Sequence, residues 1–359
     1  MERSFTAEGL LFDRHGTGPG WVRAEEGRVV SMGRGQCPFD ADASGFILTD
    51  VLNMHTHCAD YGLRIPSGMS LEELVAPPDG LKHRYLRTAP ESEIRGSMAR
   101  FSEDSRAFGS ASFVDFREGG VEGCRMLREA APEAVILGRP VSPEFDPEEI
   151  ARILEYADGI GIPSISDMDI GYIESVADAV RDARRIFALH VSERVREDID
   201  LVLSLDPAFV VHMCEATDDD ICKCAEAEVP IVVCPTSNAY FGKRCPAARV
   251  LANGADMAVG TDNGMIRSPD AVDEAAVLAG LLQEEDDPLV SAMKSLTAAS
   301  GKILNAVRVN RSTALRGPVT VIPSPEPEAG VERSRIAERA VLNWKENEDY
   351  GIQEHTCAH

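Results

Sequence analysis

The stretch FILTDVLNMHTHCAD, residues 46–60, has the pattern of a buried strand that ends in two histidines. Seven further apolar runs follow along the chain: SASFVDFRE, AVILGRPV, GIGIPSIS, IFALHVSE, AFVVHMCE, VPIVVCPTS and DMAVGTDN. Segments with the apolar period of a helix separate them, such as DPEEIARILEYA and GYIESVADAVRDARR. Eight buried strands that alternate with helices predict an α/β fold in which a parallel sheet closes into a (β/α)8 TIM barrel.

An open, doubly wound sheet is the main structural alternative. Sheets of that kind usually have a Gly-x-Gly-x-x-Gly turn after the first strand. The residues after His57 are CADYGLRIPSG, which lack that turn. We therefore expect the barrel, and we assign residues 49–305 to it.

Both ends of the chain differ from the predicted barrel. Residues 1–48 and 306–345 contain short alternating segments, such as GWVRAEEGRVVSMG and RGPVTVIP, with Pro and Gly turns between them. Because the segments at both ends share this pattern of short strands and turns, we expect them to pair into a small β-sandwich-like domain beside the barrel. Residues 346–359 are polar, and we expect them to form a tail.

The chain is strongly acidic: 60 Asp and Glu residues against 36 Lys and Arg residues give a formal net charge of −24. Such a field repels phosphate backbones and anionic membranes, so we expect neither nucleic acid nor membrane as a partner. A small polar or cationic ligand fits better. No run approaches the ~18 apolar residues of a membrane span, and the start lacks the pattern of a secretory signal. Nine scattered cysteines are typical of reduced thiols, which predicts a cytoplasmic protein. The sequence does not set the oligomeric state, and a homodimer is compatible with it.

Four of the eight histidines stand at or near the ends of predicted strands. His55 and His57 close the first strand, His190 lies in the fifth, and His212 lies in the sixth. Asp262 stands at the end of the eighth strand, in AVGTDNG. Residues i and i+2 of a strand point to the same side, so the H-x-H pair presents two imidazoles to one point. In a barrel the carboxyl ends of all strands meet on one face, where the active sites of this fold lie.

Imidazole and carboxylate ligands suit Zn²⁺ or Fe²⁺, and a catalytic metal site needs an open position for water. Any one of these histidines, taken alone, is more often a hydrogen-bonded core residue than a ligand. Asp262, taken alone, is an ordinary turn residue, because Asp-Asn-Gly runs favour turns. The conjunction of all five at one end of the predicted barrel is what points to a metal site.

Three further runs accompany these residues: His190-Val-Ser-Glu193, Cys234-Pro-Thr-Ser-Asn238 and Gly260-Thr-Asp262-Asn. In this order the chain resembles the metal-dependent amidohydrolase superfamily, and within it the branch of cytosine deaminase, chlorohydrolase and S-adenosylhomocysteine deaminase. The resemblance implies that one metal is held by four ligands: His55, His57, His190 and Asp262. It also implies that His212 holds the reactive water and that Glu193 transfers protons.

Binuclear members of that superfamily bridge two metals with a carboxylated lysine from the fourth strand. Between His57 and His190 this chain has only Lys82, in the segment PPDGLKHRYL before the second strand. We therefore predict a mononuclear site, with Zn²⁺ as the first choice and Fe²⁺ as the alternative. A Pro-Gly turn usually precedes the first-strand motif in that superfamily, and here the run is LTDVLNMHTH instead.

Other polar residues near the strand ends are candidates for contact with the substrate, although the same residue types cap helices and satisfy loops. The candidates are Asp60, Arg64, Arg117, Arg139, Ser237 and Asn238. His83, beside Lys82, is interpreted as a surface histidine, and the alternative is that its segment forms part of a cover over the barrel mouth.

The sequence therefore predicts a metal-dependent hydrolase of C–N bonds that acts on a small molecule. The leading hypothesis is deamination of an amino-substituted heteroaromatic ring, such as a purine, pyrimidine, pterin or triazine. In this hypothesis Asp262 accepts the proton of the attacking water, Glu193 protonates a ring nitrogen, and His212 stabilises the tetrahedral centre. Two alternatives remain: hydrolysis of a cyclic or acyclic amide at the same site, and a non-catalytic metal-binding protein.

Overall fold

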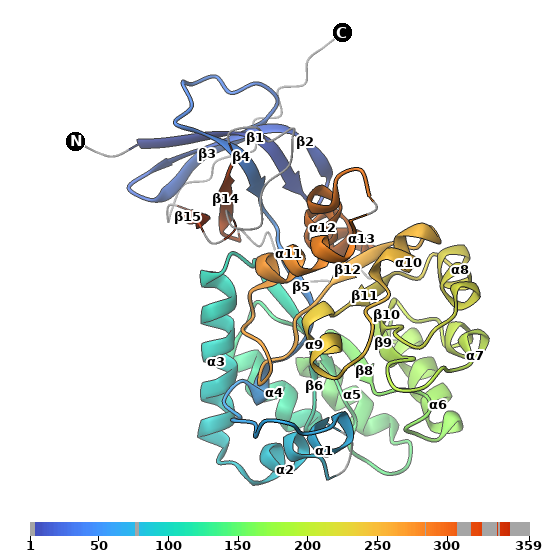
Figure 1. The fold of residues 1–359 in the computed structure, drawn as a ribbon. Coiled ribbons are helices and arrows are strands. Elements are labelled where there is room, and N and C mark those ends of the chain that lie inside the picture. The colour runs from blue at the N-terminus through green and yellow to red at the C-terminus, as the bar shows by residue number, and fades with distance from the viewer. Residues whose placement is uncertain are drawn as a thin grey trace.

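A computed structural model describes residues 4–75, 79–283, 285–306, 317–324, 336 and 338–344. The tail predicted for residues 346–359 lies outside these ranges. A small unit made of strands lies above a larger unit of strands and helices (Figure 1). None of the helices in the described ranges is long and apolar enough to span a membrane.

The large unit is built around one parallel sheet. Its strands, in chain order, are β5 (Leu52–His57), β6 (Ser112–Arg117), β7 (Val135–Gly138), β8 (Gly159–Ile162), β9 (Ile186–Val191), β10 (Phe209–His212), β11 (Ile231–Val233), β12 (Met257–Val259) and β13 (Asp262–Asn263). Consecutive strands from β5 to β12 are hydrogen-bonded neighbours, and β13 pairs with β5 at the other edge. All eight predicted runs contribute to this sheet.

The eighth predicted run forms both edges of the sheet. Its first part, β12, pairs with β11, and its second part, β13, pairs with β5, with only Gly260 and Thr261 between them. A Cβ atom at Gly260 would lie 2.6 Å from the backbone nitrogen of His55, so only glycine allows this close approach. Because one run of chain joins the two edges, the arrangement is consistent with a TIM-like barrel.

Helices follow the strands and cover the outer face of the sheet. They are α3 (Glu91–Ala107), α4 (Gly120–Ala130), α5 (Pro147–Tyr156), α6 (Ile170–Asp182), α7 (Ile199–Ser204), α8 (Asp218–Glu226), α9 (Pro235–Tyr240), α10 (Ala247–Ala252), α11 (Ala271–Leu281), α12 (Pro288–Leu296) and α13 (Ala298–Ala306). Local sequence sets several of their starts. Asp146 caps α5 directly before Pro147, and Thr217 forms a capping box with Asp220 at α8.

Two apolar cores hold the large unit together. The larger one lies between the helices and the sheet and includes Ile153, Val176 and Leu278. The smaller one is formed by strand residues of the opposite face, including Met54 and Phe116, which alternate with the residues of the first core. This double burial explains why the strands are apolar runs rather than alternating ones.

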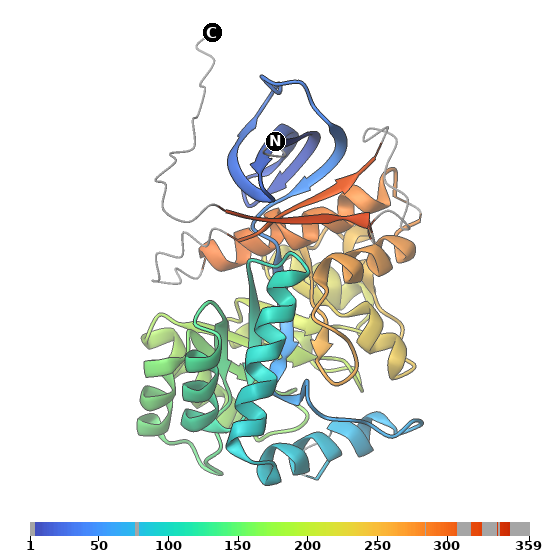
Figure 2. The same ribbon diagram turned by 90° about the vertical axis from the view of Figure 1, so that its left-hand side faces the viewer.

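The small unit is a closed barrel rather than a sandwich. Its strands, in the order in which they pair, are β1 (Ser4–Asp13), β2 (Gly16–Glu25), β3 (Arg28–Arg34), β15 (Ala340–Trp344), β14 (Val319–Pro323) and β4 (Ala43–Leu48). Figure 2 shows β14 and β15, in red, beside the blue N-terminal strands. The prediction that both chain ends form one β unit agrees with this pairing, and the sandwich detail is corrected, because pairing of β4 with both β1 and β14 leaves no open edge.

The first predicted strand, FILTDVLNMH, is two strands. Residues up to Leu48 belong to β4 of the small barrel, and residues from Leu52 belong to β5 of the large sheet. Asp50, between them, has a φ of 57°, which turns the chain from one unit into the other. Both halves are apolar because each is buried in its own core, so their local pattern shows no break.

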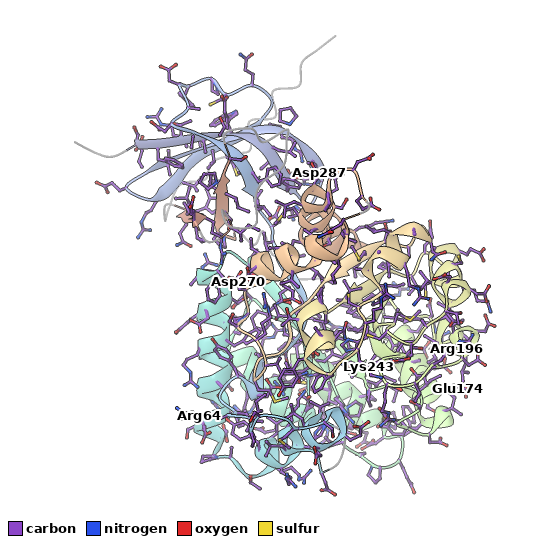
Figure 3. The ribbon with its side chains drawn as sticks, viewed as in Figure 1. Arg64, Glu174, Arg196, Lys243, Asp270 and Asp287 are labelled. Atoms are coloured by element: carbon purple, nitrogen blue, oxygen red, sulfur yellow. The ribbon has the colours of Figure 1, made fainter. Side chains whose placement is uncertain are left out.

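Two short helices lie at the end of the large unit that faces away from the small barrel (Figures 1 and 2). A single turn, η1 (Cys58–Asp60), follows β5, and α1 (Leu71–Val75) and α2 (Leu81–Thr88) come next. We call α1 and α2 together the cover. At the opposite end, Asp270 and Asp287 cap α11 and α12 on the side near the small barrel (Figure 3).

Candidate active site

Five polar side chains meet at the carboxyl ends of the strands of the large sheet. His55 and His57 come from β5, His190 from β9, His212 from β10 and Asp262 from β13. In two overlapping groups, His55 with His57 and His190, and His55 with His212 and Asp262, the ligand atoms all lie within 4.8 Å of one another. The structure thus brings together all five residues that the sequence placed at one end of the sheet.

Three of the strand ends near this centre carry strained backbone. Ser192, His212 and Asp262 have φ angles of 49°, 79° and 61°, in a region that residues other than glycine rarely adopt. Such conformations cost free energy and persist where the surrounding structure imposes them, often at functional sites.

His55 is the residue that best shows what the centre can hold. It is fully buried, and neither of its ring nitrogens has a hydrogen-bond partner, although Nε2 lies 3.3 Å from Oδ1 of Asp262. Burial lowers the pKa of His55 to about 4, so its imidazole is neutral at pH 7. A buried polar ring without a partner is costly, and a metal ion bound at its nitrogen would satisfy it. The residues present therefore fit a divalent metal.

The other imidazoles are oriented by their second ring nitrogens. Nδ1 of His57 lies 3.1 Å from the carbonyl oxygen of Phe116, and Nδ1 of His190 lies 3.0 Å from that of Ile162. A carbonyl oxygen only accepts, so each Nδ1 carries the proton and donates it, which leaves Nε2 free as a ligand. Burial also holds the pKa of His190 well below its usual range.

Asp262 is held by a neighbour from the segment after β11. Ser237 donates a hydrogen bond from Oγ to Oδ2 of Asp262. Burial alone would raise the pKa of Asp262, but the close approach of the His55 ring, together with His212 and His57, holds it well below its usual range. Asp262 is thus an ionised carboxylate, as a metal ligand requires.

Glu193 lies beside His212 at the edge of the centre. Its Oε1 is 3.7 Å from Nε2 of His212, and its side chain is 19% exposed, so it faces the opening. Burial, reinforced by the charge of Asp262, raises the pKa of Glu193 to about 8. The carboxyl group therefore carries a proton at neutral pH and can donate it.

A buried charge network next to His57 includes Lys82, which the sequence did not assign to the site, and Glu118, a polar residue that follows the second predicted strand. Oε1 of Glu118 is 3.0 Å from Nδ1 of His57, and Nζ of Lys82 is 2.7 Å from the same oxygen. Lys82 also donates to Oδ1 of Asn263, at 3.1 Å, and its side chain is 4% exposed. Despite burial, Lys82 and His57 hold the pKa of Glu118 well below its usual range. A lysine alone in a polar segment offered no sequence signal for this position.

A pocket opens above the centre and extends under the cover. It is lined by His57, Val75, Lys82, His83, Glu118, Arg139, Pro163, Ser164, Asp167, His190, Glu193, Arg194, His212, Asp262 and Asn263. We call it the mouth pocket. The interpretation of His83 as a surface residue is wrong: it is half-buried in this lining, and its Nε2 lies 3.0 Å from the carbonyl oxygen of Val75. The cover brings it there from a segment distant in sequence.

The six candidates for substrate contact fall into different places. Of these, only Arg139 lines the mouth pocket. Arg64 is exposed outside it and lies at the side of the molecule in Figure 3. Arg117 is 1% exposed and pairs with Asp115 and Glu118, so its charge is already used within the fold.

The remaining three candidates are buried and lie outside the lining of the pocket. Asp60 is fully buried and accepts a hydrogen bond from the backbone of Met265, at 2.9 Å. Ser237 contacts Asp262, and the side-chain amide of Asn238 lies 3.2 Å from Nδ1 of His212. None of the three lines the pocket, and of them only Ser237 contacts a predicted metal ligand.

Comparison with known proteins agrees with this geometry. Residues 111–309 match the model of the amidohydrolase family, which covers β6 to β13 and therefore most of the large sheet. The chain belongs to the amidohydrolase family. Members of this family are metal-dependent hydrolases that act on C–N bonds. For this amidohydrolase, the predictions of a hydrolase and of the superfamily are confirmed, whereas the deaminase branch is not decided.

Relatives of this amidohydrolase occur in archaea. An uncharacterised protein of Methanocaldococcus jannaschii is 30% identical over 291 residues, which span 74% of this chain and 75% of that protein. A protein of Archaeoglobus fulgidus that carries the provisional name aminohydrolase is 34% identical over 265 residues, which span 74% of this chain and 77% of that protein.

Solved structures share the fold of this amidohydrolase. An adenosine deaminase from Xanthomonas campestris with bound zinc has a TM-score of 0.68 at 16% identity, over 94% of this chain and 89% of that chain. A guanine deaminase from C. acetobutylicum with bound guanine has a TM-score of 0.62 at 14% identity, over 93% of this chain and 94% of that chain. At these identities the likeness establishes the fold alone.

Proposed function

We propose that this amidohydrolase is a deaminase of an amino-substituted heteroaromatic ring. The observation that carries the proposal is the position of Glu193, 3.7 Å from His212 at the opening of the centre, with a raised pKa of about 8. A carboxyl group that is protonated at neutral pH beside a metal centre can deliver a proton to a ring nitrogen. Deamination at a ring carbon requires that step.

We propose that one divalent metal, Zn²⁺ in the first instance, is held by His55, His57, His190 and Asp262. When bound, such a metal supplies acidified water and a positive charge at the reacting carbon. The fourth strand, β8, consists of GIGI and has no lysine to bridge a second metal. Lys82, the only lysine between His57 and His190, is engaged with Glu118 and Asn263. These observations support a mononuclear site.

The remaining steps are assigned to three side chains. Asp262, ionised in the fold, takes the proton from the attacking water. Glu193 donates its proton to a ring nitrogen. Burial lowers the pKa of His212 to about 4, so it acts as a neutral imidazole that hydrogen-bonds the developing tetrahedral centre. The proton held by Asp262 then passes to the departing amino group, and ionised Glu193 recovers a proton from the new hydroxyl group. Ammonia leaves, the ring carbonyl forms, and both carboxyl groups return to their starting states.

The chemistry of the site and the names of the fold neighbours support a proposal for the substrate class. A neighbour is named as an adenosine deaminase and another as a guanine deaminase. A third, from Burkholderia multivorans, is named as an N-isopropylammelide isopropylaminohydrolase, with a TM-score of 0.65 at 14% identity over 95% of this chain and 96% of that chain. All three names describe removal of an amine from a ring. We therefore propose a purine, pyrimidine, pterin or triazine as the substrate ring of this protein.

Ammonia release from a panel of such rings, measured together with the metal content of the purified protein, tests the proposal. We expect release from at least one ring, about one metal per chain, and loss of release in Glu193→Gln with unchanged metal content. Ring opening of hydantoins without ammonia release would favour amide hydrolysis instead. One metal per chain with no turnover of any panel member would favour the non-catalytic alternative, and a ratio near two would contradict the mononuclear site.

A further inference from the structure

The mouth pocket is lined by both acidic and basic side chains, in a chain that as a whole carries a net charge of −24. Three basic side chains other than histidine line it: Lys82, Arg139 and Arg194. Two of them form ion pairs within the fold. Lys82 pairs with Glu118 at 2.7 Å, and Arg194 pairs with Asp167 at 2.8 Å.

Arg139 differs from the other two. Among the described residues, its guanidinium makes no ion pair and no side-chain hydrogen bond; only its backbone is engaged, where its N–H donates to the carbonyl oxygen of Arg117 at 2.8 Å. It follows β7 directly, so the strand end fixes where it enters the pocket. The carboxylates whose charges act on it, Glu118 and Asp167, already have closer partners in Lys82 and Arg194.

This arrangement leaves a sheltered cation without a counter-ion. Burial lowers the pKa of Arg139, which means that the fold disfavours its charge, although an arginine stays protonated in proteins. A charge taken out of water is costly unless an anion pairs with it. Its position in the same pocket as Glu193 and Asp262 makes a substrate the natural source of that anion.

We propose that Arg139 binds an anionic group of the substrate, a carboxylate or a phosphate, while the reacting ring lies toward Glu193. The inference rests on the proposed deaminase function and refines its substrate class to a ring that bears an acidic substituent. Guanidinium groups bind both anions through two parallel hydrogen bonds, which a lysine cannot reproduce. The net charge of the chain repels anions at long range, and a cation inside the pocket would offset that repulsion for such a substrate.

Binding of small aromatic probes to the metal-loaded protein tests this inference without any need for turnover. Isothermal titration calorimetry at fixed ionic strength would compare benzoate, phenyl phosphate and neutral benzamide. The variants are Arg139→Gln, Arg139→Lys and, as a matched control, Arg181→Gln, an exposed arginine at the end of α6 that pairs with Asp178. Circular dichroism checks that each variant is folded, and Arg139→Lys keeps the charge if Arg139→Gln is unstable.

We expect the affinity of benzoate or phenyl phosphate to be at least about tenfold higher for the unmodified protein than for Arg139→Gln. Arg139→Lys should have an intermediate affinity, and Arg181→Gln should have the affinity of the unmodified protein. Benzamide should not distinguish the variants. Preference for benzoate identifies a carboxylate, and preference for phenyl phosphate identifies a phosphate. If each anion binds the unmodified protein and Arg139→Gln with equal affinity, the inference is overturned; anions that bind only to the metal would give this result. Failure of both anions to bind the unmodified protein would also overturn it.

The two proposals fail separately. Arg139-dependent anion binding in a protein that releases no ammonia from any ring would remove the deaminase proposal and keep the anion site. Ammonia release without Arg139-dependent anion binding would keep the deaminase proposal and remove the anion site.

Discussion

Nζ of Lys82 lies 2.7 Å from Oε1 of Glu118, and this ion pair joins the cover to the end of β6. The same glutamate contacts Nδ1 of His57 at 3.0 Å, so a residue of the cover acts on a predicted metal ligand through one carboxylate. Both charges are nearly fully buried. Removal of one partner would therefore leave the other charge without sufficient compensation.

Lys82→Met is expected to lower the free energy of unfolding by about 3 kcal/mol, the lower end of the range for a broken buried pair, because Arg117 still pairs with Glu118. The matched control is Lys302→Met, since Lys302 forms an ion pair with Asp256 in which both side chains are largely exposed. That change should cost less than about 1 kcal/mol. Urea denaturation measures both, and equal costs would show that the Lys82 pair contributes no more than a surface pair.

Glu193 gives the protein a defined dependence of stability on pH. In the unfolded chain its carboxyl ionises near the usual pKa of 4.5, whereas in the fold its pKa is about 8. Between these values the native state retains a proton that the unfolded chain has lost, so stability falls as the pH rises from about 4.5 to about 8. The contribution is present below pH 4.5 and is lost as the pH passes 8.

Glu193→Gln should remove this part of the profile, a difference on the order of a few kcal/mol between pH 5 and pH 9 in metal-free protein. Chemical denaturation at several pH values measures it. Glu174→Gln serves as the control, because Glu174 is an exposed residue on the outer helix α6 (Figure 3). Parallel pH profiles for the unmodified protein and Glu193→Gln would contradict the raised pKa.

His55 should be the residue whose loss most affects metal retention, because the metal is the partner that its buried ring lacks. We expect His55→Asn to lose the metal on dialysis and the unmodified protein to keep about one equivalent. Saturating metal should raise the melting temperature of the unmodified protein, since a ligand at a thousand times its Kd stabilises the native state by about 4 kcal/mol. His15→Asn, at an exposed position, is the matched control. If His55→Asn keeps the metal and its stabilisation, the proposed ligand set is wrong.

Ser237 is expected to tune the metal through Asp262, to which its hydroxyl donates. Ser237→Ala should weaken metal affinity by roughly tenfold or more, as loss of a hydrogen bond to a ligand usually does. Competition with a chelator measures the affinity. Ser204→Ala, an exposed serine whose hydroxyl bonds to the backbone of Leu201, should leave it unchanged. A change of similar size in both variants would argue against the role of Ser237.

Much of the fold could be predicted because its determinants are local. Apolar runs and helix caps such as Asp146 are properties of short segments, and they predicted the order of strands and helices correctly. His55, His57 and His190 could be found because the carboxyl ends of their strands lie on one face of a parallel, barrel-like sheet. Their convergence follows from the fold class without knowledge of any loop.

The rest depended on contacts between distant segments. Lys82 meets Asn263 across 181 residues of sequence, and nothing in the segment around it marks a buried lysine. The charges of Arg117 and Arg139 appeared equivalent at two strand ends, yet one is paired within the fold and the other faces the pocket.

The sequence by itself determined the alternation of strands and helices and the set of residues at the strand ends, because periodicity and residue type act over a few neighbours. Only the tertiary structure decided that FILTDVLNMH serves two units and that the cover encloses the pocket. It also decided which charged groups near the centre are left for a substrate. The physical reason is that burial and charge pairing are properties of the space around a side chain, and that space is filled by residues far away in the chain.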